Sequence, residues 1–353
     1  MTLAIPAGDR RGRARTATGL LAVLLACAIV VSLQTGASDA SLLALVGNWT
    51  GLSDHVLSQH DLTIVRDIRL PRMAMGVLVG ASLAVSGALM QGLFRNPLAD
   101  PGLIGVSAGA SLGAVSIIVL GSGMMAPAVA LAGIYALPLA AFCGALATTF
   151  LLYGIATRGG RTSIATMLLA GIAIAALAFA FTGLMVFAAD DRQLRDLTFW
   201  SLGSLAGASW TKIASSGPII LAALAASPLL AHGLNAIALG EATAAHLGVS
   251  VQRFKNLAIV AVAAATGAAV AVSGGIGFIG IVVPHLLRLA IGPDHRYLLP
   301  ASALLGAAML LATDAVARTI VAPAELPIGI VTAFFGAPFF LWILLRRRGL
   351  LDL

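Results

Sequence analysis

The sequence predicts an all-α polytopic membrane protein with ten transmembrane helices, and three observations support this fold class. Of its 353 residues 59% are hydrophobic and only 10% are charged, with a mean hydropathy of +1.01. A soluble domain has about 25% charged residues. The apolar residues form long runs, near the roughly 20 residues that a helix needs to cross a bilayer. The basic residues gather in the connecting segments on one side of those runs.

The predicted helices follow the chain as ten apolar runs. They cover residues 17–34, 72–93, 103–121, 127–155, 163–188, 213–231, 255–273, 276–292, 298–317 and 327–347. The run 127–155 is long, so it is expected to tilt or to extend past the lipid. The apolar stretch 197–211 is short and is expected to be a half-helix or a surface segment. The first run follows several arginines, as a signal peptide would, but no convincing small-residue cleavage site follows it.

The basic residues predict the orientation of the chain. With the N-terminus in the cytoplasm, fourteen of the 21 lysines and arginines fall on the cytoplasmic side. Such an excess is what the positive-inside rule expects. Both termini are therefore predicted to be cytoplasmic, with residues 1–16 as a tail and 1–353 as one transmembrane domain. The net charge of +7 has the same explanation, so we expect no nucleic-acid partner.

Small residues recur at four-residue spacing in two of the predicted helices. Gly76 and Gly80 lie in the second, and Gly105, Gly109 and Gly113 lie in the third. Residues four apart share one face of a helix, and small side chains let two backbones approach closely inside a membrane. These glycines are therefore predicted to form helix–helix contacts.

Motifs for catalysis and for metal binding are absent from the sequence. It has no G-x-x-x-x-G-K-[ST] loop, and Cys27 and Cys143 form neither a metal nor a disulfide pattern. We expect no enzyme activity, no bound cofactor or metal, and no ATPase site of its own. Asp314 and His285 are the ionisable residues clearly inside predicted helices. One acid and one histidine make a poor proton or sodium relay, which argues against an ion-coupled secondary transporter. Asp314 is predicted to pair with Arg318, four residues later.

The stretch LGEATAAHLGVSVQRFKN, residues 239–256, is a polar segment between the sixth and seventh predicted helices. Residues 239–247 are expected to form a short helix with Glu241 in its first turn. Gly248 is placed as its C-terminal cap. Such a helix suits a groove in a cytoplasmic partner. The alternative is an ordinary loop helix lying on the membrane surface.

GEATAAHLGV resembles the cytoplasmic loop of ABC-transporter permeases, and three longer blocks narrow the resemblance. The blocks IRLPRMAMGVLVGASLAVSGALMQGLFRNPLADPGLIGVSAGAS, GGIGFIGIVVPHLLRLAIGPDHRYLLP and AELPIGIVTAFFGAPFFLWIL are similar to permeases that import vitamin B12, ferric siderophores and heme. The resemblance runs from about residue 64 to 349. It implies a homodimer in the bacterial inner membrane with ten helices per subunit. It also implies two cytoplasmic ATPase subunits, which use ATP and Mg, and a periplasmic binding protein.

The same resemblance assigns roles to residues at both faces of the membrane. It implies that residues 239–248 form the coupling helix of the permease, within a cytoplasmic coupling segment of residues 232–254. The residues implied to face the ATPase are Glu241, Ala242, His246, Leu247 and Gly248. The arginines at positions that pair with glutamates of the binding protein are Arg69, Arg72 and Arg318. The alternative for the arginines is that they anchor helix ends at lipid headgroups.

The resemblance implies transport by alternating access and leaves the substrate open. RNPLADPGLIG and FWSLGSLAGASW are most similar to heme permeases, so heme is expected, with a ferric siderophore or cobalamin as the alternative. His285 and His295 are candidate heme contacts, since imidazole is a common axial ligand. Alternatively, Asp294 and His295 organise the turn before the ninth helix. Met185 and Phe187 are candidates for lining the path. A heme enzyme or electron carrier would need paired ligands inside the membrane.

Overall fold

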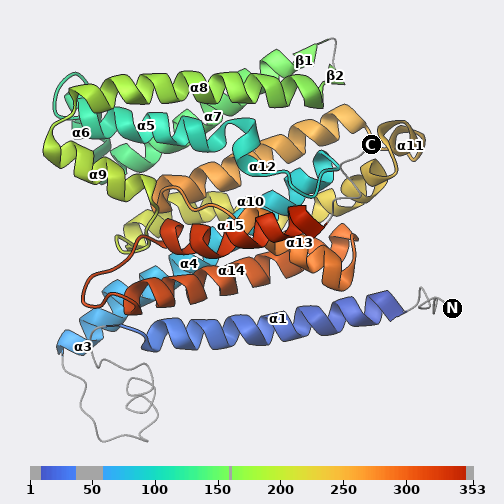
Figure 1. The fold of residues 1–353 in the computed structure, drawn as a ribbon, viewed down its shortest axis with the longest axis horizontal. Coiled ribbons are helices and arrows are strands. Elements are labelled where there is room, and N and C mark those ends of the chain that lie inside the picture. Colours follow the sequence, from blue (N-terminus) through green and yellow to red (C-terminus); the bar gives the residue numbers. More distant parts are fainter. Residues whose placement is uncertain (1–8, 37–58, 159–160, 347–353) are drawn as a thin grey trace, which may run out of the picture.

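A computed structural model describes residues 9–36, 59–158 and 161–346, and it is a bundle of long helices (Figure 1). Within these residues ten helices match the ten predicted runs in order. They are α1 (Asp9–Gln34), α4 (Leu70–Leu93), α5 (Val106–Leu120), α7 (Ala136–Ala156), α8 (Ile164–Ala188), α10 (Trp210–Ala238), α12 (Val251–Ser273), α13 (Ile279–Ile291), α14 (His295–Thr319) and α15 (Ile328–Arg346). Seven spans are long and apolar enough to cross a membrane, and α5, α13 and α15 are shorter apolar helices.

Short elements connect the long helices. α3 (Gln59–Thr63) and the π-helix η1 (Ile64–Arg69) run directly into α4. The other short helices are η2 (Pro101–Ile104), α6 (Ala126–Ala132), η3 (Gly133–Tyr135), α9 (Asp191–Ser201) and α11 (Glu241–His246). Two-residue strands, β1 (Thr157–Arg158) and β2 (Arg161–Thr162), pair antiparallel in the turn between α7 and α8. We call these two paired strands the β1–β2 turn.

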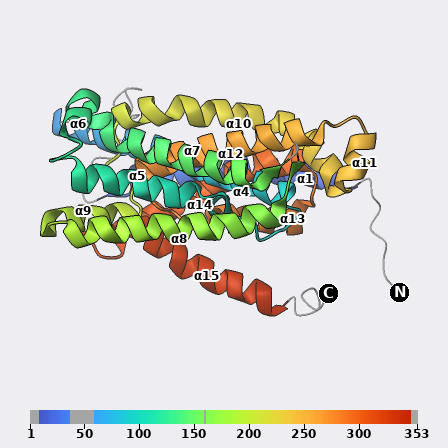
Figure 2. The same cartoon turned by 90° about the horizontal axis from the view of Figure 1, so that it is seen from above.

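The two ends of the bundle carry different short elements. The beginning of α1, the end of α15, α11 and the β1–β2 turn lie at one end, and α3, α6 and α9 lie at the other (Figure 1). We call these the cytoplasmic end and the outer end, following the predicted orientation. The described ends of the chain thus lie at the same end of the bundle, while the predicted cytoplasmic termini themselves lie outside the described residues. α8 and α15 lie at the periphery of the bundle, and α15 diverges from it (Figure 2).

Glycines let the central helices touch backbone to backbone, as the four-residue spacing predicted. A methyl group added at Gly80 of α4 would lie 2.4 Å from the carbonyl oxygen of Gly306 in α14. One added at Gly109 of α5 would lie 2.2 Å from the carbonyl oxygen of Gly144 in α7. Side chains essentially never approach a backbone so closely, so a larger residue at either glycine forces the helices apart.

The run 127–155 is not one long helix. α6 ends at a turn in which Gly133 has a φ of +55°, a region that favours glycine, and α7 begins after it. With 21 residues, α7 has the length of a membrane span by itself. The extra length therefore belongs to a separate short helix at the outer end, rather than to a tilted span.

The segment 197–211 is neither a half-helix nor a simple surface segment. Its first residues end α9, and an irregular stretch follows in which Gly203 has a φ of +70°. This stretch is hydrogen-bonded to its neighbours: Ser204 N donates to Ser273 O at 2.8 Å, and Ile328 N donates to Gly203 O at 3.0 Å. The stretch therefore joins the end of α12 to the start of α15, which a local apolar pattern does not reveal.

Candidate functional site

α11 is a six-residue helix that projects from the cytoplasmic end of the bundle (Figure 1). Gly248 follows it with a φ of +83°, so the predicted short helix and its glycine cap are confirmed. Ala244 is fully buried and faces the bundle, whereas Leu247 is 59% exposed. Ala242, His246 and Gly248 are also exposed. Small and apolar side chains on a projecting helix form a surface suited to a partner's groove.

Glu241 differs from the other residues of this surface because it also bonds to its own chain. Its Oε1 lies 2.7 Å from Nζ of Lys255 in the first turn of α12. The Glu241 side chain remains 43% exposed, while that of Lys255 is 5% exposed. This ion pair fixes α11 against α12 and still leaves part of the carboxylate open to a partner.

The outer end carries a buried charge cluster on α4 and α14. Arg72 donates to both carboxylate oxygens of Asp314, with Nη2 to Oδ1 at 2.9 Å. Arg318 Nε lies 3.0 Å from Oδ2 of the same carboxylate, which confirms the predicted i,i+4 pair. Arg72 also forms a two-pronged pair with Glu325, at 2.9 Å on each side. One fully buried acid thus compensates two arginines, and a second acid, 38% exposed, covers Arg72.

The remaining bonds of the arginines hold the end of α1. Arg69 Nη1 donates to Leu33 O at 2.8 Å, and Arg318 Nη1 donates to Thr35 O at 2.7 Å. Arg318 Nη2 also donates to Ser32 O at 3.1 Å. The last carbonyls of a helix lack partners within it, so cationic donors there satisfy them and complement the helix dipole.

The structure thus brings Arg69, Arg72 and Arg318 together, although they lie on two helices far apart in the sequence. All three are bonded within the chain, and their side chains are largely buried. Internal bonding gives each a role in the fold, and it does not decide whether a partner also reaches them. Docking of a binding protein at these arginines therefore stays a prediction.

The turn before α14 is organised by Asp294, as one of the two alternatives predicted. The Asp294 carboxylate accepts from Arg296 N at 3.1 Å and from Asn235 Nδ2 at 2.7 Å. The hydrogen bond from the Arg296 side chain holds the pKa of Asp294 down, at about 2. His295 is buried, and its Nδ1 lies 2.8 Å from Oδ1 of Asn235. His295 therefore packs against α10 at the turn between α13 and α14.

The other candidate substrate contacts lie on separate helices. His285 is 3% exposed in α13. Met185 is half-buried in α8, where its sulfur lies 3.7 Å from Oγ of Ser116. Phe187, also on α8, is 92% exposed. None of these positions tests contact with heme, so the contacts stay predictions. The described residues include no group of three or more His, Cys, Asp or Glu that could hold a metal ion.

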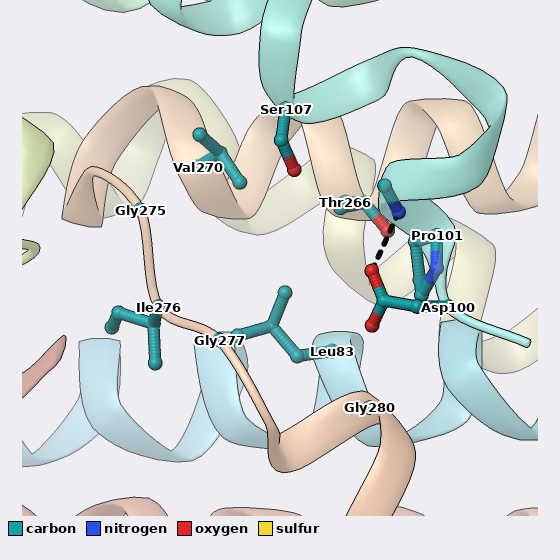
Figure 3. A pocket seen from close by; sticks show the side chains of 11 residues that line it. Leu83, Asp100, Pro101, Ser107, Thr266, Val270, Gly275, Ile276, Gly277 and Gly280 are labelled. Atoms are coloured by element: carbon teal, nitrogen blue, oxygen red, sulfur yellow. Dashed lines mark hydrogen bonds between the residues drawn. The ribbon is translucent and has the colours of Figure 1, made fainter. Parts of the chain in front are cut away.

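A polar pocket of about 230 Å³ lies beside the connection from α12 to α13 and the start of α5 (Figure 3). It is lined by the extended stretch between α12 and α13 and by residues from α4, η2 and α5. Asp100, whose Oδ1 accepts from Gly102 N at 2.7 Å, borders it. Thr266 of α12 also lines the pocket, and its buried hydroxyl has no hydrogen-bond partner among the described residues. The pocket is smaller than the roughly 300–1,000 Å³ of typical small-molecule sites.

Asp100 falls between the predicted runs 72–93 and 103–121, and the structure places it deep in the bundle. A methyl group added at Gly280 would lie 3.4 Å from Asp100 Oδ2 and 3.1 Å from the carbonyl oxygen of Leu83, in the middle of α4. The chain after α4 therefore turns back into the bundle before α5 begins. The stretch PLADPG, with two prolines and a glycine, was the available indication of an irregular backbone there.

Comparisons with known proteins agree over nearly the whole chain. The family model described as the FecCD transport family matches residues 22–346. The hemin transport system permease protein HmuU of Yersinia pestis is 44% identical over 338 residues, which cover 96% of this chain and 98% of that protein. The cobalamin import system permease protein BtuC of Halobacterium salinarum is 46% identical over 285 residues, covering 81% of this chain and 74% of that protein.

A solved structure is similar as well. A metal-chelate type ABC transporter in an inward-facing conformation matches with a TM-score of 0.80 and 31% identity. The match covers 93% of this chain and 98% of that chain. The similarity therefore extends to the arrangement of the helices and is not confined to a few motifs.

Proposed function

The chain belongs to the FecCD transport family and is a permease of the ABC importer class in the bacterial inner membrane, and we propose that it imports heme. The observation that carries this proposal is the match to a hemin permease over 96% of the chain. Cobalamin permeases match almost as strongly, over 81% of the chain for one of them. A ferric siderophore or cobalamin is therefore the alternative substrate.

We propose that α11 is the coupling helix that docks on the ATPase. Its exposed side is formed by Ala242, His246, Leu247 and Gly248, and Glu241 lies at its first turn. α11 contacts both α10 and α12, so a movement of α11 caused by the ATPase can be transmitted to the bundle. ATP and Mg would be used by the partner subunits, since this sequence has no phosphate-binding loop.

We propose further that the permease works as a homodimer that receives its substrate from a periplasmic binding protein. α8 and α15 support the first part, because both lie at the periphery of the bundle (Figure 2) and carry exposed apolar side chains, among them Phe179 and Phe334. The cluster of Arg69, Arg72 and Arg318 supports the second, because it gathers cationic side chains at the outer end. Alternating access would then open the path between two subunits first outward and then inward.

Uptake into proteoliposomes that contain the permease, its ATPase and the binding protein tests this function. Hemin, a ferric siderophore and cobalamin are compared with and without ATP. ATP-dependent uptake of hemin alone is the expected result. Uptake of cobalamin or of the siderophore instead would overturn heme as the substrate and keep the importer. Uptake that stops when ion gradients collapse, and continues without ATP, would identify an ion-coupled transporter instead.

A further inference from the structure

Lys255 is a buried lysine at the cytoplasmic end, and the chain contains only one other lysine, Lys212. It is 4% exposed in the first turn of α12. Burying an ammonium group is costly unless the charge is paired and its donors are satisfied. Lys255 meets this condition with Glu241 of α11 at 2.7 Å and with the carbonyl oxygen of Thr162 at 3.4 Å. One side chain therefore touches both α11 and the β1–β2 turn.

A second residue of the same helical turn ties α12 to that β1–β2 turn. Gln252 Nε2 donates to Thr162 Oγ1 and to Tyr153 Oη, each at 2.7 Å. Gln252 Oε1 accepts from Thr162 N at 3.2 Å, so both ends of the amide are used. Tyr153, near the end of α7, also bonds to Asn256 of α12.

These contacts form a continuous set of hydrogen bonds from α11 through α12 to the β1–β2 turn. The turn leads directly into α8, which begins at Ile164. The bundle holds these helices unequally: the apolar part of α12 is 72% buried, whereas that of α8 is 11% buried. Within one chain, α8 is therefore packed against its neighbours over a smaller part of its surface than α12 is.

We propose that Lys255 and Gln252 are positioning residues that carry a movement of α11 to the β1–β2 turn and so to α8. The inference rests on the proposed role of α11 as the coupling helix. It adds the route by which a movement of α11 reaches α8, which follows the β1–β2 turn in the chain. Coupling between sites requires such a connected element whose position both sites influence.

The test measures hemin uptake and ATP hydrolysis together in proteoliposomes of the full transporter. Lys255→Met removes the charge and keeps the apolar stem. We expect the hemin moved per ATP to fall at least about fivefold, the lower limit of a typical coupling energy, while hydrolysis continues. Lys255→Arg keeps both contacts possible and should restore most of the ratio. Arg253→Met is the matched control, because Arg253 is a neighbouring basic residue that is exposed on the same helix.

A spectroscopic measurement separates transmission of movement from a loss of folding. Spin labels are placed at Ala245→Cys on α11 and Arg158→Cys on the β1–β2 turn, after the exposed Cys27 and Cys143 are replaced by alanine. The distance between the labels should remain the same when ATP binds to the unmodified network. In the Lys255→Met variant, the distribution of distances between the labels should broaden when ATP binds. If Lys255→Met does not assemble, Gln252→Ala is used in its place, with the same expected result.

The possible results separate this inference from the proposed function. An unchanged ratio and an unchanged distance in both Lys255→Met and Gln252→Ala would overturn the inference and leave the importer intact. An equal loss of coupling in Arg253→Met would also overturn it, because the effect would then not depend on the buried contacts. If the unmodified transporter shows no ATP-driven uptake of any of the three chelates, the proposed function itself fails.

Discussion

The acid that pairs with basic residues is held differently at the two ends of the bundle. At the outer end, the side chains of Arg72, Asp314 and Arg318 are each at most 8% exposed, and they lock two long helices together. At the cytoplasmic end, the carboxylate of Glu241 is 43% exposed on a helix of six residues. A charge buried between long helices stabilises one packing of those helices. A half-exposed charge on a short helix can also bind a partner protein. The outer cluster therefore fixes two long helices together, whereas α11 keeps part of a carboxylate open to a partner.

The largest effect is expected at the outer end, from Asp314→Asn. This change leaves Arg72 and Arg318 buried beside a neutral amide. Breaking a buried ion pair by removing one partner costs about 3–5 kcal/mol of stability. Unfolding of the purified permease in detergent measures the loss. Asp196→Asn, at an exposed acid of α9, is the control and should cost little. Equal stability of the two variants would show that the cluster does not lock the bundle.

At the cytoplasmic end a smaller effect is expected, and it should alter the uptake per ATP hydrolysed rather than the stability of the permease. Glu241→Arg places a cation against Lys255, so α11 should lose its fixed position while the long helices stay packed. We expect hemin uptake per ATP to fall about tenfold, equivalent to about 1.4 kcal/mol, with little change in the unfolding of the permease. Glu241→Gln keeps a hydrogen bond to Lys255 and should lose less. Normal uptake in the arginine variant would contradict the role of α11.

The smallest effect is expected from Glu325→Gln, which tests whether the binding protein reaches Arg72 at the outer end. If carboxylates of the binding protein reach Arg72, Glu325 competes with them. Neutralising it should tighten docking by no more than about fivefold, since a partly exposed pair contributes at most about 1 kcal/mol. Binding of the binding protein to the reconstituted permease measures this, and the gain should be larger at low salt. Reversing Arg72 itself would break its pair with Asp314 and so confuse docking with folding.

Asp67→Asn provides the control for that measurement. Asp67 is an exposed acid of η1, so its neutralisation changes the net charge of the outer end by the same amount. A general attraction between charged surfaces would respond equally to both variants. Equal tightening, or weaker docking in Glu325→Gln, would contradict access of the binding protein to Arg72.

The ten helices could be predicted from the sequence because each depends on a local property. An apolar run of sufficient length must leave water, and glycines four residues apart mark the faces that touch. The breaks were harder to predict, because they depend on distant partners. Gly203 is held by the start of α15, and Asp100 lies beside α13, so neither environment is visible in the neighbouring residues.

The same difference explains which parts of the sites were found. α11 was predicted because an acid in the first turn and a glycine after the last are local features. The pairing of Asp314 with Arg318 was predicted for the same reason, but its stronger partner Arg72 lies 242 residues away in the sequence. Lys255 was noted as part of a polar segment, and its contact with Thr162 needed the folded chain.

The pairing of Arg72 with Asp314 can form only late in the synthesis of the chain. Asp314 is added 242 residues after Arg72, so at about 5–20 residues per second Arg72 waits roughly 10–50 s for its counter-charge. During that interval α1 also lacks the arginine of α14 that bonds to its last carbonyls. A nascent chain that stops before α14 therefore carries Arg72 without either of the acids that pair with it in the folded protein.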